Sequence, residues 1–376
     1  MLAGTAGSTM RGKASLAAIG DLILSRQQPH LFRFIGPVLR QHEFTVAHLE
    51  VVYTARHPEA VRLGRTPDAL EPLVEAGIKL VTLAGNHVMD YGPEGIEDTV
   101  RWLDERGIAH AGAGCDLEEA RRPAILEHAG YRVAVLSYNC VGPKETWARH
   151  NRPGCAYVRI ITHYELDHAT PGGPPEVFTW AEPRTLQQMC DDIQRLRPQC
   201  DLLVVALHKG IGHVPVVLAD YELQVAHAAV DAGADVVLSH HAHILKGIEV
   251  YRGKVIFHGL GNGAVYLPED AFDSGSLPED WRRRRRQLFG FEPDPRYPTY
   301  PFHPDARYAM IARVILADGG LSAAGFVPCL VMPDGIPRPV GDDDAGREVF
   351  RYVQRVTEEA GLSATLRFRD GCAWVE

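Results

Sequence analysis

Side chains that bind transition metals in proteins come directly after several short apolar segments of this sequence. Five such segments are followed by carboxylate, amide or imidazole groups, in chain order Asp21, Glu50, Asn86-His87, His208 and His240-His241-Ala242-His243. A single Asp or His after a strand is usually a turn residue or a hydrogen-bonded one, but recurrence at five segments indicates a common site. These groups suit Mn, Fe or Zn, and the lack of Cys among them argues against a structural zinc site.

The number of candidate ligands favours two ions. A single tetrahedral ion needs fewer groups than the sequence offers, and a carboxylate such as Glu50 can bridge a pair of ions. Two adjacent ions lower the pKa of a water molecule and stabilise both the attacking and the leaving oxygen. The pattern therefore predicts hydrolysis at an electrophilic phosphorus or at a carbonyl carbon.

The segments that carry these residues are nearly all apolar, which is typical of strands buried on both faces of a sheet. Strands are predicted at 16–20, 44–49, 78–84, 131–138, 201–207, 234–239 and 254–258. Helices are predicted between them at 67–76, 93–106, 184–197 and 218–232. This alternation favours βαβ units and a largely parallel sheet, whose ligands bind outside the carboxyl ends of the strands.

Composition excludes several classes of protein. The chain has 376 residues, of which 45% are hydrophobic and 23% charged, so it can form a full globular core. A net charge of −9 argues against nucleic-acid binding, and no uninterrupted apolar run is long enough to predict a membrane span. Seven scattered Cys without a CxxC motif favour a reducing compartment, so we expect a cytoplasmic protein. A homo-oligomer is compatible with this composition.

Two segments interrupt the alternation of predicted strands and helices, and they define the predicted domain organisation. We expect a core domain over residues 14–267, in which the Pro- and Gly-rich segment 140–183 forms a long loop over the site. Residues 268–376 are expected to be a Pro- and Arg-rich loop and a C-terminal extension that packs on the core, with strands at 308–316 and 330–332 and a helix at 345–359. The run Arg282–Arg286 is interpreted as a solvated or subunit-contact loop.

Several motifs occur together and in order along the chain. They are A-I-G-D-L-I-L, A-H-L-E, G-N-H-V-M-D-Y-G, the long segment that ends in S-H-H-A-H-I-L-K-G-I-E-V-Y, and G-L-G-N. Together, over roughly residues 14–264, they resemble the CapA (poly-γ-glutamate capsule-synthesis) family of the calcineurin-like metallophosphatase superfamily. The resemblance implies a metallophosphatase-like four-layer α/β/β/α sandwich with a metal site at the C-terminal ends of the strands.

The resemblance also implies a role for each motif residue. Asp21 and His243 would hold the first metal, and Glu50 would bridge the two ions. The second metal would be held by Asn86, His208 and His241. His87 would contact the substrate and protonate its leaving group, and Asp90, three residues later, could orient the His87 imidazole.

The chain departs from the family pattern near the first metal. Leu22-Ile23 follow Asp21 where the superfamily has Asp-x-His, so one ligand is missing and this site is expected to be weak or empty. His48 stands where the family usually has Asn, and it could replace the lost ligand or cap a turn. Lys209 stands where the family usually has Trp, and it could bind an anionic oxygen or face solvent.

Two further residues adjoin the motif ligands. His241 and His243 share one side of an extended chain, so His240 is expected to point elsewhere and to support the ligands from behind. Asn262, in G-L-G-N, is expected to form a tight turn rather than to bind metal.

The leading functional hypothesis is a soluble metal-dependent hydrolase with a dinuclear or partly occupied centre, in which water attacks a phosphoester. The substrate would be a small anionic or acyl compound, and the cofactors two divalent ions of Mn, Fe or Zn. One alternative is amide or γ-glutamyl bond chemistry, as in poly-γ-glutamate metabolism. Another is a non-catalytic capsule or assembly protein that retains a structural metal.

Overall fold

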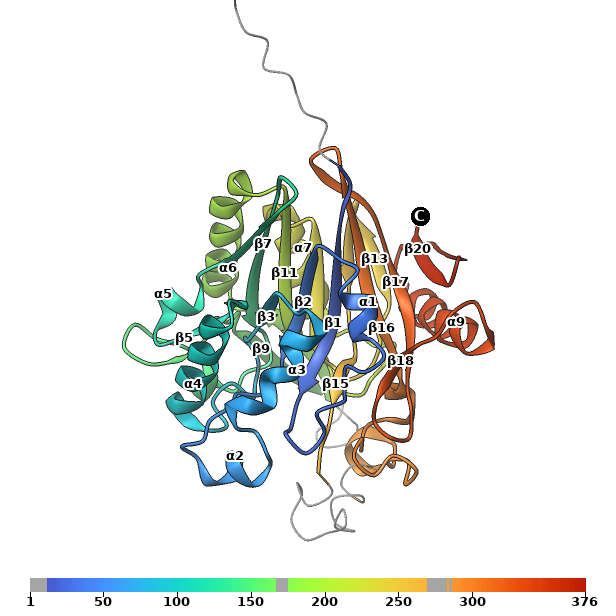
Figure 1. The fold of residues 1–376 in the computed structure, drawn as a ribbon. Helices are drawn as coiled ribbons and strands as arrows, with labels where there is room; N and C mark the ends of the chain where they lie inside the picture. Colours follow the sequence, from blue (N-terminus) through green and yellow to red (C-terminus); the bar gives the residue numbers. More distant parts are fainter. Residues whose placement is uncertain (1–11, 167–174, 269–282, 284–285) are drawn as a thin grey trace, which may run out of the picture.

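Two β-sheets packed face to face form the centre of the molecule, as a computed structural model of the chain shows (Figure 1). The structure describes residues 12–166, 175–268, 283 and 286–376. Among them, the first sheet has the strand order β19-β20-β17-β16-β1-β2-β3-β4, with β15 paired to β1 and β18 paired to β17. The second sheet has the order β13-β14-β12-β11-β7-β6.

The strands of the first sheet come from both ends of the chain. They are β1 (Ala14–Ile23), β2 (Phe44–Leu49), β3 (Leu80–Thr82), β4 (Ala109–Ala111), β15 (Asn262–Val265), β16 (Tyr308–Ala317), β17 (Gly320–Val331), β18 (Pro337–Pro339), β19 (Leu366–Arg369) and β20 (Cys372–Val375). The strands of the second sheet are β6 (Ala124–His128), β7 (Tyr131–Asn139), β11 (Leu202–Lys209), β12 (Val236–His241), β13 (Ile248–Tyr251) and β14 (Lys254–Phe257). Because β16 pairs directly with β1, the C-terminal part of the chain enters the same sheet as the N-terminal part.

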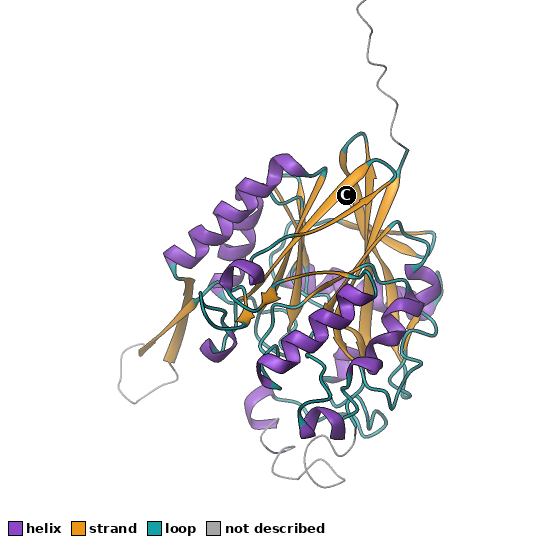
Figure 2. Cartoon of the chain, turned by 60° about the vertical axis from the view of Figure 1, so that its left-hand side comes forward, coloured by secondary structure: helices purple, strands orange, loops and turns teal. Residues whose placement is uncertain are grey.

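Helices cover the outer face of each sheet. One hydrophobic core lies between the first sheet and α1 (Gly36–Leu39), α3 (Glu71–Ala76) and α4 (Gly92–Glu105), and another lies between the second sheet and α6 (Pro183–Leu196) and α7 (Asp220–Ala232). The third core joins the facing sides of the two sheets, and α9 (Asp344–Glu359) contributes to it. The expected four-layer α/β/β/α arrangement is therefore confirmed (Figure 2).

The remaining helical segments are short. They are α2 (Pro58–Arg62), α5 (Leu117–Ala120) and the 3₁₀ turns η1 (Pro67–Leu70), η2 (Lys144–Thr146), η3 (Arg197–Gln199) and η5 (Pro304–Arg307). The prediction of one helix over 67–76 becomes η1 followed by α3, which ends at Gly77 in the left-handed conformation that glycine favours. No helix of the described residues is both long and apolar enough to cross a membrane.

The sheets are mixed rather than largely parallel, which corrects the sequence prediction. Neighbours β1-β2-β3-β4 and β14-β12-β11-β7 are parallel, but β16–β17, β6–β7 and β13–β14 pair antiparallel. The antiparallel pairs are joined by short turns, which cannot connect parallel neighbours. The βαβ pattern thus held only for the central strands, which carry most of the predicted site.

The segment 140–183 is not a long loop over the site. It contains β8 (Gly154–Cys155), which pairs with β5 (Ala113–Gly114), and a hairpin of β9 (Ile160–Leu166) and β10 (Pro175–Ala181). The hairpin projects from the body of the molecule (Figure 2), and the backbone of Ala181 at its base donates to Gln224 of α7 at 2.7 Å. The β-branched and aromatic residues of I-I-T-H-Y-E-L and P-E-V-F-T-W-A favour strands, a signal that the Pro and Gly count of the segment obscured.

The arginine run is only partly described. Arg282, Arg284 and Arg285 lie outside the described residues, and Arg286 forms an ion pair with Glu292. The proposed boundary at residue 267 and the role of this run remain predictions.

Candidate metal centre

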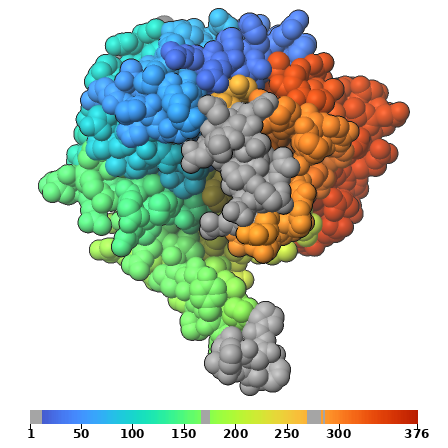
Figure 3. All heavy atoms as spheres, turned by 90° about the horizontal axis from the view of Figure 1, so that it is seen from below, coloured from blue at the N-terminus to red at the C-terminus, as the bar shows by residue number. Residues whose placement is uncertain are grey.

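The carboxyl ends of β1, β2, β11 and β12 meet at one rim of the paired sheets. Within the first sheet Asp21 is in register with His48, and within the second His208 is in register with His240. The two sheets are joined here, because the backbone N–H of His241 donates to the Asp21 carboxylate at 3.2 Å. Seen from this end, the surface has a hollow between the green and the orange segments of the chain (Figure 3).

Four buried side chains form the centre of this rim. One ligand atom from each of Asp21, His48, Glu50 and His208 lies within 4.8 Å of the others. All four side chains are almost completely buried. Two carboxylates and two imidazoles without a cysteine are a donor set that suits Mn, Fe or Zn.

Glu50 occupies the middle of the group. Its Oε2 faces His48 Nε2 at 3.5 Å and His208 Nδ1 at 3.8 Å. Its Oε1 faces His243 Nε2 and His87 Nε2, each at 3.9 Å. Each carboxylate oxygen therefore has imidazole nitrogens within 4 Å, so both oxygens are available to a cation at the rim.

Many polar atoms at the rim are buried without a hydrogen-bonding partner. They are His48 Nε2, both carboxylate oxygens of Glu50, His208 Nδ1, both ring nitrogens of His240, and His241 Nδ1. Leaving a buried polar atom unpaired costs free energy, so proteins nearly always satisfy such atoms. These five imidazole nitrogens and two carboxylate oxygens fit one or two divalent cations.

His48 is part of this group and does not cap a turn. Its Nδ1 lies 3.0 Å from Thr82 Oγ1 on the neighbouring strand β3, which leaves Nε2 directed at Glu50. Its ring also stacks on that of His240, with centroids 4.6 Å apart. Of the two predicted alternatives, the geometry supports the replacement of the lost ligand.

His240 points into the rim, which corrects the expectation that it points away. Its Nδ1 lies 3.8 Å from Asp21 Oδ1, and its side chain is 1% exposed. His240 is in register with His208, and paired residues of neighbouring strands share one face of the sheet, so β12 itself directs His240 to the rim. His241 and His243 have positive φ values of +88° and +53°, which are uncommon for residues other than glycine, and this bend brings their imidazoles to the same group.

His243 is oriented by a chain of hydrogen bonds that runs through Asn262 and Tyr300 to the backbone of Ala306. The carbonyl of Ala306 can only accept, so the Tyr300 hydroxyl donates to it (2.8 Å) and accepts from Asn262 Nδ2 (2.7 Å). Asn262 Oδ1 then faces His243 Nδ1 at 2.9 Å, which fixes the proton on Nδ1 and leaves the lone pair on Nε2. Asn262 thus begins β15 and orients His243, whereas the sequence favoured a tight turn and kept Asn262 as a second candidate for supporting the site.

The predicted catalytic pair is formed on the outer side of Glu50. His87 Nδ1 lies 2.8 Å from Asp90 Oδ2, and the His87 side chain is 41% exposed. Asn86, the preceding residue, turns inward, with its Oδ1 2.6 Å from His208 Nε2. The structure therefore brings together every predicted ligand and the predicted acid at one rim.

Lys209 is the exception, since it neither faces solvent nor lies among the rim residues. Its side chain is fully buried, and Nζ lies 3.1 Å from Glu222 Oε2 and 3.2 Å from His258 Nδ1. Successive side chains of a strand point to opposite faces, so the inward position of His208 sends Lys209 to the other side of β11. The prediction that Lys209 faces solvent is wrong, and the anionic oxygen that it contacts belongs to Glu222 and not to a ligand at the rim.

The two buried carboxylates have opposite pKa shifts. Burial and the charge of Glu50 raise the pKa of Asp21 well above its usual value. Burial raises the pKa of Glu50 too, but His208, His48, His243 and His87 together outweigh it and hold that pKa well below its usual value. Glu50 is thus held in its ionised form, and its negative charge opposes the ionisation of Asp21. A bound cation would remove this repulsion and favour the ionised form of both.

Burial favours the neutral form of three imidazoles at the rim, those of His208, His240 and His241. Burial lowers the pKa of His208 and of His240 well below the usual value, and lowers that of His241 to about 4. Metal ions bind the neutral imidazole, so these residues need lose no proton to act as ligands near neutral pH. Burial also lowers the pKa of His87, but its hydrogen bond to Asp90 and the charge of Glu50 outweigh this and raise it, which favours the protonated form that an acid needs.

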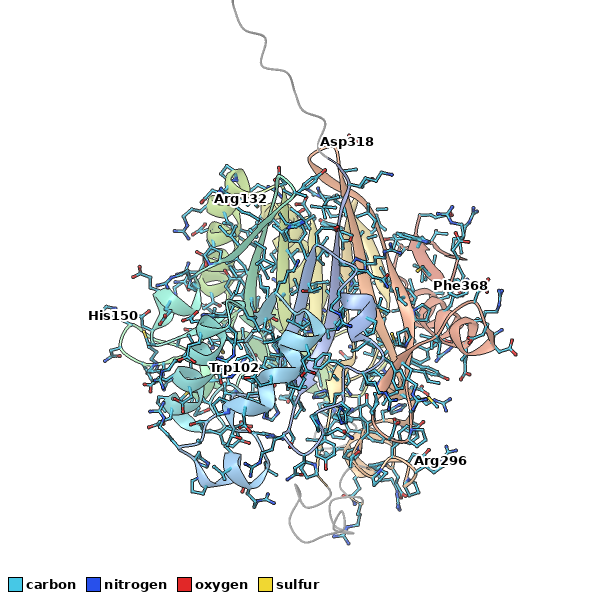
Figure 4. The ribbon with its side chains drawn as sticks, in the orientation of Figure 1. Trp102, Arg132, His150, Arg296, Asp318 and Phe368 are labelled. Carbon is cyan, nitrogen blue, oxygen red and sulfur yellow. The ribbon has the colours of Figure 1, made fainter. Side chains whose placement is uncertain are left out.

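Two large cavities lie away from the rim. One of about 590 Å³ is lined by His150 and Asp192, and the other, of about 570 Å³, by Arg132 and Asp201. Figure 4 shows His150 on one flank and Arg132 near the end of the sheets where Asp318 also lies, opposite the rim. Neither cavity includes a predicted site residue.

The fold and the rim define an α/β protein with a candidate divalent-metal centre at the strand ends. Residues 11–265 match the family described as "Bacterial capsule synthesis protein PGA_cap", and the chain belongs to this family. The predicted resemblance to the CapA family is thereby confirmed.

Individual relatives carry names that concern capsule or polymer synthesis. The PGA biosynthesis protein CapA of Bacillus subtilis is 27% identical over 265 residues (66% of this chain, 62% of that protein). A probable polyglutamine synthesis accessory protein of Mycobacterium tuberculosis is 31% identical over 258 residues (66% of this chain, 61% of that protein). The match thus spans less than two thirds of the length of these two relatives.

Solved structures align over most of the chain at low identity. A structure described as a novel phosphatase from Mycoplasma pneumoniae is 10% identical, covers 85% of this chain and 95% of its own, and has a TM-score of 0.48. A calcineurin-like phosphoesterase of Bacillus subtilis is 11% identical, covers 93% of this chain and 97% of its own, and has a TM-score of 0.35.

Sequence reasoning missed the residues that hold the rim in place. Thr82 and Tyr300 orient His48 and His243, respectively. Tyr300 lies beyond the segment matched by the family and follows no motif, so no local pattern pointed to it. A third missed residue is Arg65, a buried cation whose charge acts on His87.

Proposed function

We propose that the protein is a metal-dependent hydrolase with a dinuclear centre that acts on a phosphoester. The observation that supports this most is the position of Glu50, between the inward-facing imidazoles of three histidines and beside the exposed His87–Asp90 pair. A site that only stabilised the fold would need no exposed acid next to its ligands.

The residues fit two divalent ions of Mn, Fe or Zn. Asp21 and His243 would hold the first ion, with His48 or His240 in place of the ligand that the sequence lacks. Asn86, His208 and His241 would hold the second ion, and Glu50 would lie between the two. Such ions polarise a phosphoryl oxygen and lower the pKa of a water molecule.

His87 would donate a proton to the leaving oxygen of the substrate. Its raised pKa favours the protonated ring, and its Nε2 lies on the side of Glu50 while Nδ1 is held by Asp90. Asp90 does not reach the reacting atoms; it fixes the tautomer and orientation of the ring. The burial of Glu50 and Asp21 excludes water from the far side of the rim.

The experiment is to compare wild type and His87→Asn on phosphoesters after loading with manganese, iron or zinc. We expect turnover of an alkyl phosphoester to fall by roughly 10²–10⁴-fold, the usual worth of a positioned acid. The loss should be smaller for a nitrophenyl phosphoester, whose leaving group needs no proton. Metal content and melting temperature should stay at the wild-type values, because His87 is exposed and no proposed ligand bonds to it.

Asp90→Asn provides the matched control, since it should give a smaller defect of the same kind. Unchanged turnover of alkyl phosphoesters in His87→Asn would remove His87 from the mechanism. A wild-type protein that binds metal but hydrolyses no phosphoester would overturn the proposed function.

A second candidate is hydrolysis or transfer at an amide bond of a γ-glutamyl chain. It is favoured by the names of the relatives, which concern PGA biosynthesis and polyglutamine synthesis. The same centre can polarise a carbonyl oxygen, so the residue roles would not change. Incubation of the metal-loaded protein with γ-glutamyl oligomers and with phosphoesters, followed by detection of released amine and phosphate, separates the two candidates.

A further inference from the structure

A buried arginine lies beside the proposed acid without an acidic partner. Arg65 is 7% exposed, and its backbone is fixed by hydrogen bonds with Ala60 and Thr54. Its Nη1 donates to the hydroxyl of Tyr91 at 2.8 Å. Among the residues that the structure describes, no carboxylate oxygen lies within 4.0 Å of its guanidinium.

The nearby carboxylates form ion pairs with other side chains. Glu59 pairs with Arg62 at 2.6 Å, Asp98 pairs with Arg56 at 2.9 Å, and Asp90 binds His87. A guanidinium has five N–H donors, and only one donor of Arg65 has a partner in the described chain. Arg65 keeps 7% of its surface exposed, and none of its nitrogens is among the fully buried atoms without a partner, so its free donors are open to a ligand from solvent. An anion that binds there from outside would supply the counter-charge that the neighbouring carboxylates do not.

The surroundings place Arg65 on the substrate side of the rim. Tyr91, which accepts its hydrogen bond, directly follows Asp90 in the turn that carries the His87–Asp90 pair. The charge of Arg65 also acts on Tyr53, a residue three positions after Glu50 whose hydroxyl accepts from the backbone of Leu24 at 2.7 Å. Arg65 therefore lies where the chain segments that leave β1, β2 and β3 come together.

An imidazole nitrogen without a partner lies in the same place. His57 Nδ1 is buried and makes no hydrogen bond, and the His57 ring lies 5.3 Å from the ring of Tyr91. Arg65 and His57 thus both lie against Tyr91, and each has hydrogen-bonding capacity that no described residue uses.

We propose that Arg65 binds the oxygens of an anionic group of the substrate, a phosphoryl group if the proposed function is correct. The planar fork of a guanidinium matches two oxygens of a phosphate, which gives both charge and orientation. Next to His87, this interaction places the ester with its leaving oxygen toward the acid. The inference rests on the proposed function for the identity of the anion and names its class: a phosphomonoester or another substrate with a terminal oxyanion.

The test is a titration of the manganese-loaded protein with inorganic phosphate, measured by calorimetry, for wild type and Arg65→Gln. We expect the affinity for phosphate to fall by 10–100-fold in the variant, since a hydrogen bond to a charged group contributes that much. Arg65→Lys should recover part of the affinity, because it keeps the charge and loses the fork. Metal content should not change in either variant.

Arg56→Gln is the matched control. It removes the same charge from an exposed guanidinium nearby that is already paired with Glu97 and Asp98, so it should leave the affinity for phosphate unchanged. The melting temperature of metal-free Arg65→Gln should stay level or rise, because the substitution removes an unpaired buried charge.

Three results would overturn the inference. They are equal phosphate affinity in wild type and Arg65→Gln, no phosphate binding by wild type, and a collapse of the fold in both Arg65 variants, which would assign Arg65 to the core. Failure of the proposed function looks different: phosphate would still bind through Arg65, but the wild-type protein would hydrolyse no phosphoester.

Discussion

Two buried polar clusters begin at adjacent residues of β11 and differ in how their charges are satisfied. His208 enters the rim with Asp21, Glu50 and His48, where seven buried polar atoms lack a partner. Lys209 points to the other side of the strand, into a cluster that we call the lysine network. Its members are Lys209, Glu222, His227, Lys246, Glu249 and His258.

The lysine network satisfies its charges internally. Glu222 accepts from Lys209 at 3.1 Å and from Lys246 at 3.3 Å. His258 connects Lys209 to Glu249, at 3.2 and 2.9 Å respectively. The two ammonium groups outweigh the burial of Glu222 and lower its pKa to about 2.

The contrast separates a structural cluster from one prepared for a ligand. Both are buried and both contain carboxylates and imidazoles, so burial and composition alone do not distinguish them. The clusters differ in whether their buried polar atoms have hydrogen-bonding partners, because an unpaired buried atom costs free energy unless a ligand binds it. The lysine network should therefore determine the stability of the metal-free protein, and the rim should respond to metal.

The largest expected effect is on stability from the lysine network. Glu222→Gln leaves two buried ammonium groups without their counter-charge, so it should lower the free energy of unfolding by about 3–5 kcal/mol. Denaturant unfolding of the metal-free protein measures this. Asp21→Asn is the control at the rim, and it should cost little or be stabilising because the folded state disfavours ionised Asp21. Equal destabilisation by the two substitutions would remove the distinction between the clusters.

The next effect is the stabilisation of the rim by metal. Divalent metal at a hundredfold excess over Kd should raise the free energy of unfolding of the wild-type protein by about 2.7 kcal/mol per ion. His208→Ala should abolish the gain from the second ion, whereas His227→Ala, in the lysine network, should retain the whole gain. Elemental analysis of the reconstituted proteins gives the stoichiometry. A wild-type protein that retains no Mn, Fe or Zn would contradict the dinuclear interpretation.

A smaller effect is expected from the hydrogen-bond chain behind His243. Tyr300→Phe removes the group that holds Asn262, so the affinity for the more weakly bound ion should fall by about tenfold. Tyr297→Phe is the control, since Tyr297 lies near Tyr300 without a hydrogen bond to Asn262. The measurement is competition of the protein with a metal-sensitive dye. No change in affinity would show that Asn262 orients His243 without help from Tyr300.

The smallest effect is a dependence on pH that identifies Glu222. Its folded pKa, about 2, lies below the unfolded value of 4.5, so its contribution is complete above pH 4.5 and is lost as pH falls toward 2. Between pH 4.5 and 3.5 the stability difference between wild type and Glu222→Gln should narrow by about 1 kcal/mol. Denaturant unfolding at these two pH values tests this. A constant difference would mean that Glu222 is not held ionised by the lysines.

The sequence was sufficient to locate the rim. Apolar strands followed by Asp21, Glu50, Asn86 and His208 predicted one metal site, because parallel strands place their carboxyl ends together. The pairing of His87 with Asp90 was also predictable, since three residues within one turn are close whatever the rest of the chain does. The four-layer fold was predicted from the resemblance of the motifs to a family. All of these predictions therefore depended on short segments of sequence or on motifs.

Only the tertiary structure decided which side chains face the rim and what holds them. The pairing of β11 with β12 placed His240 on the same face as His208, and the inward position of His208 sent Lys209 to Glu222. Tyr300 reaches Asn262 across 38 residues of chain, and Arg65 reaches Tyr91 across 26. Contacts over such separations depend on how the sheets and their connecting segments pack, and the periodicity of a single strand or helix contains no information about that packing.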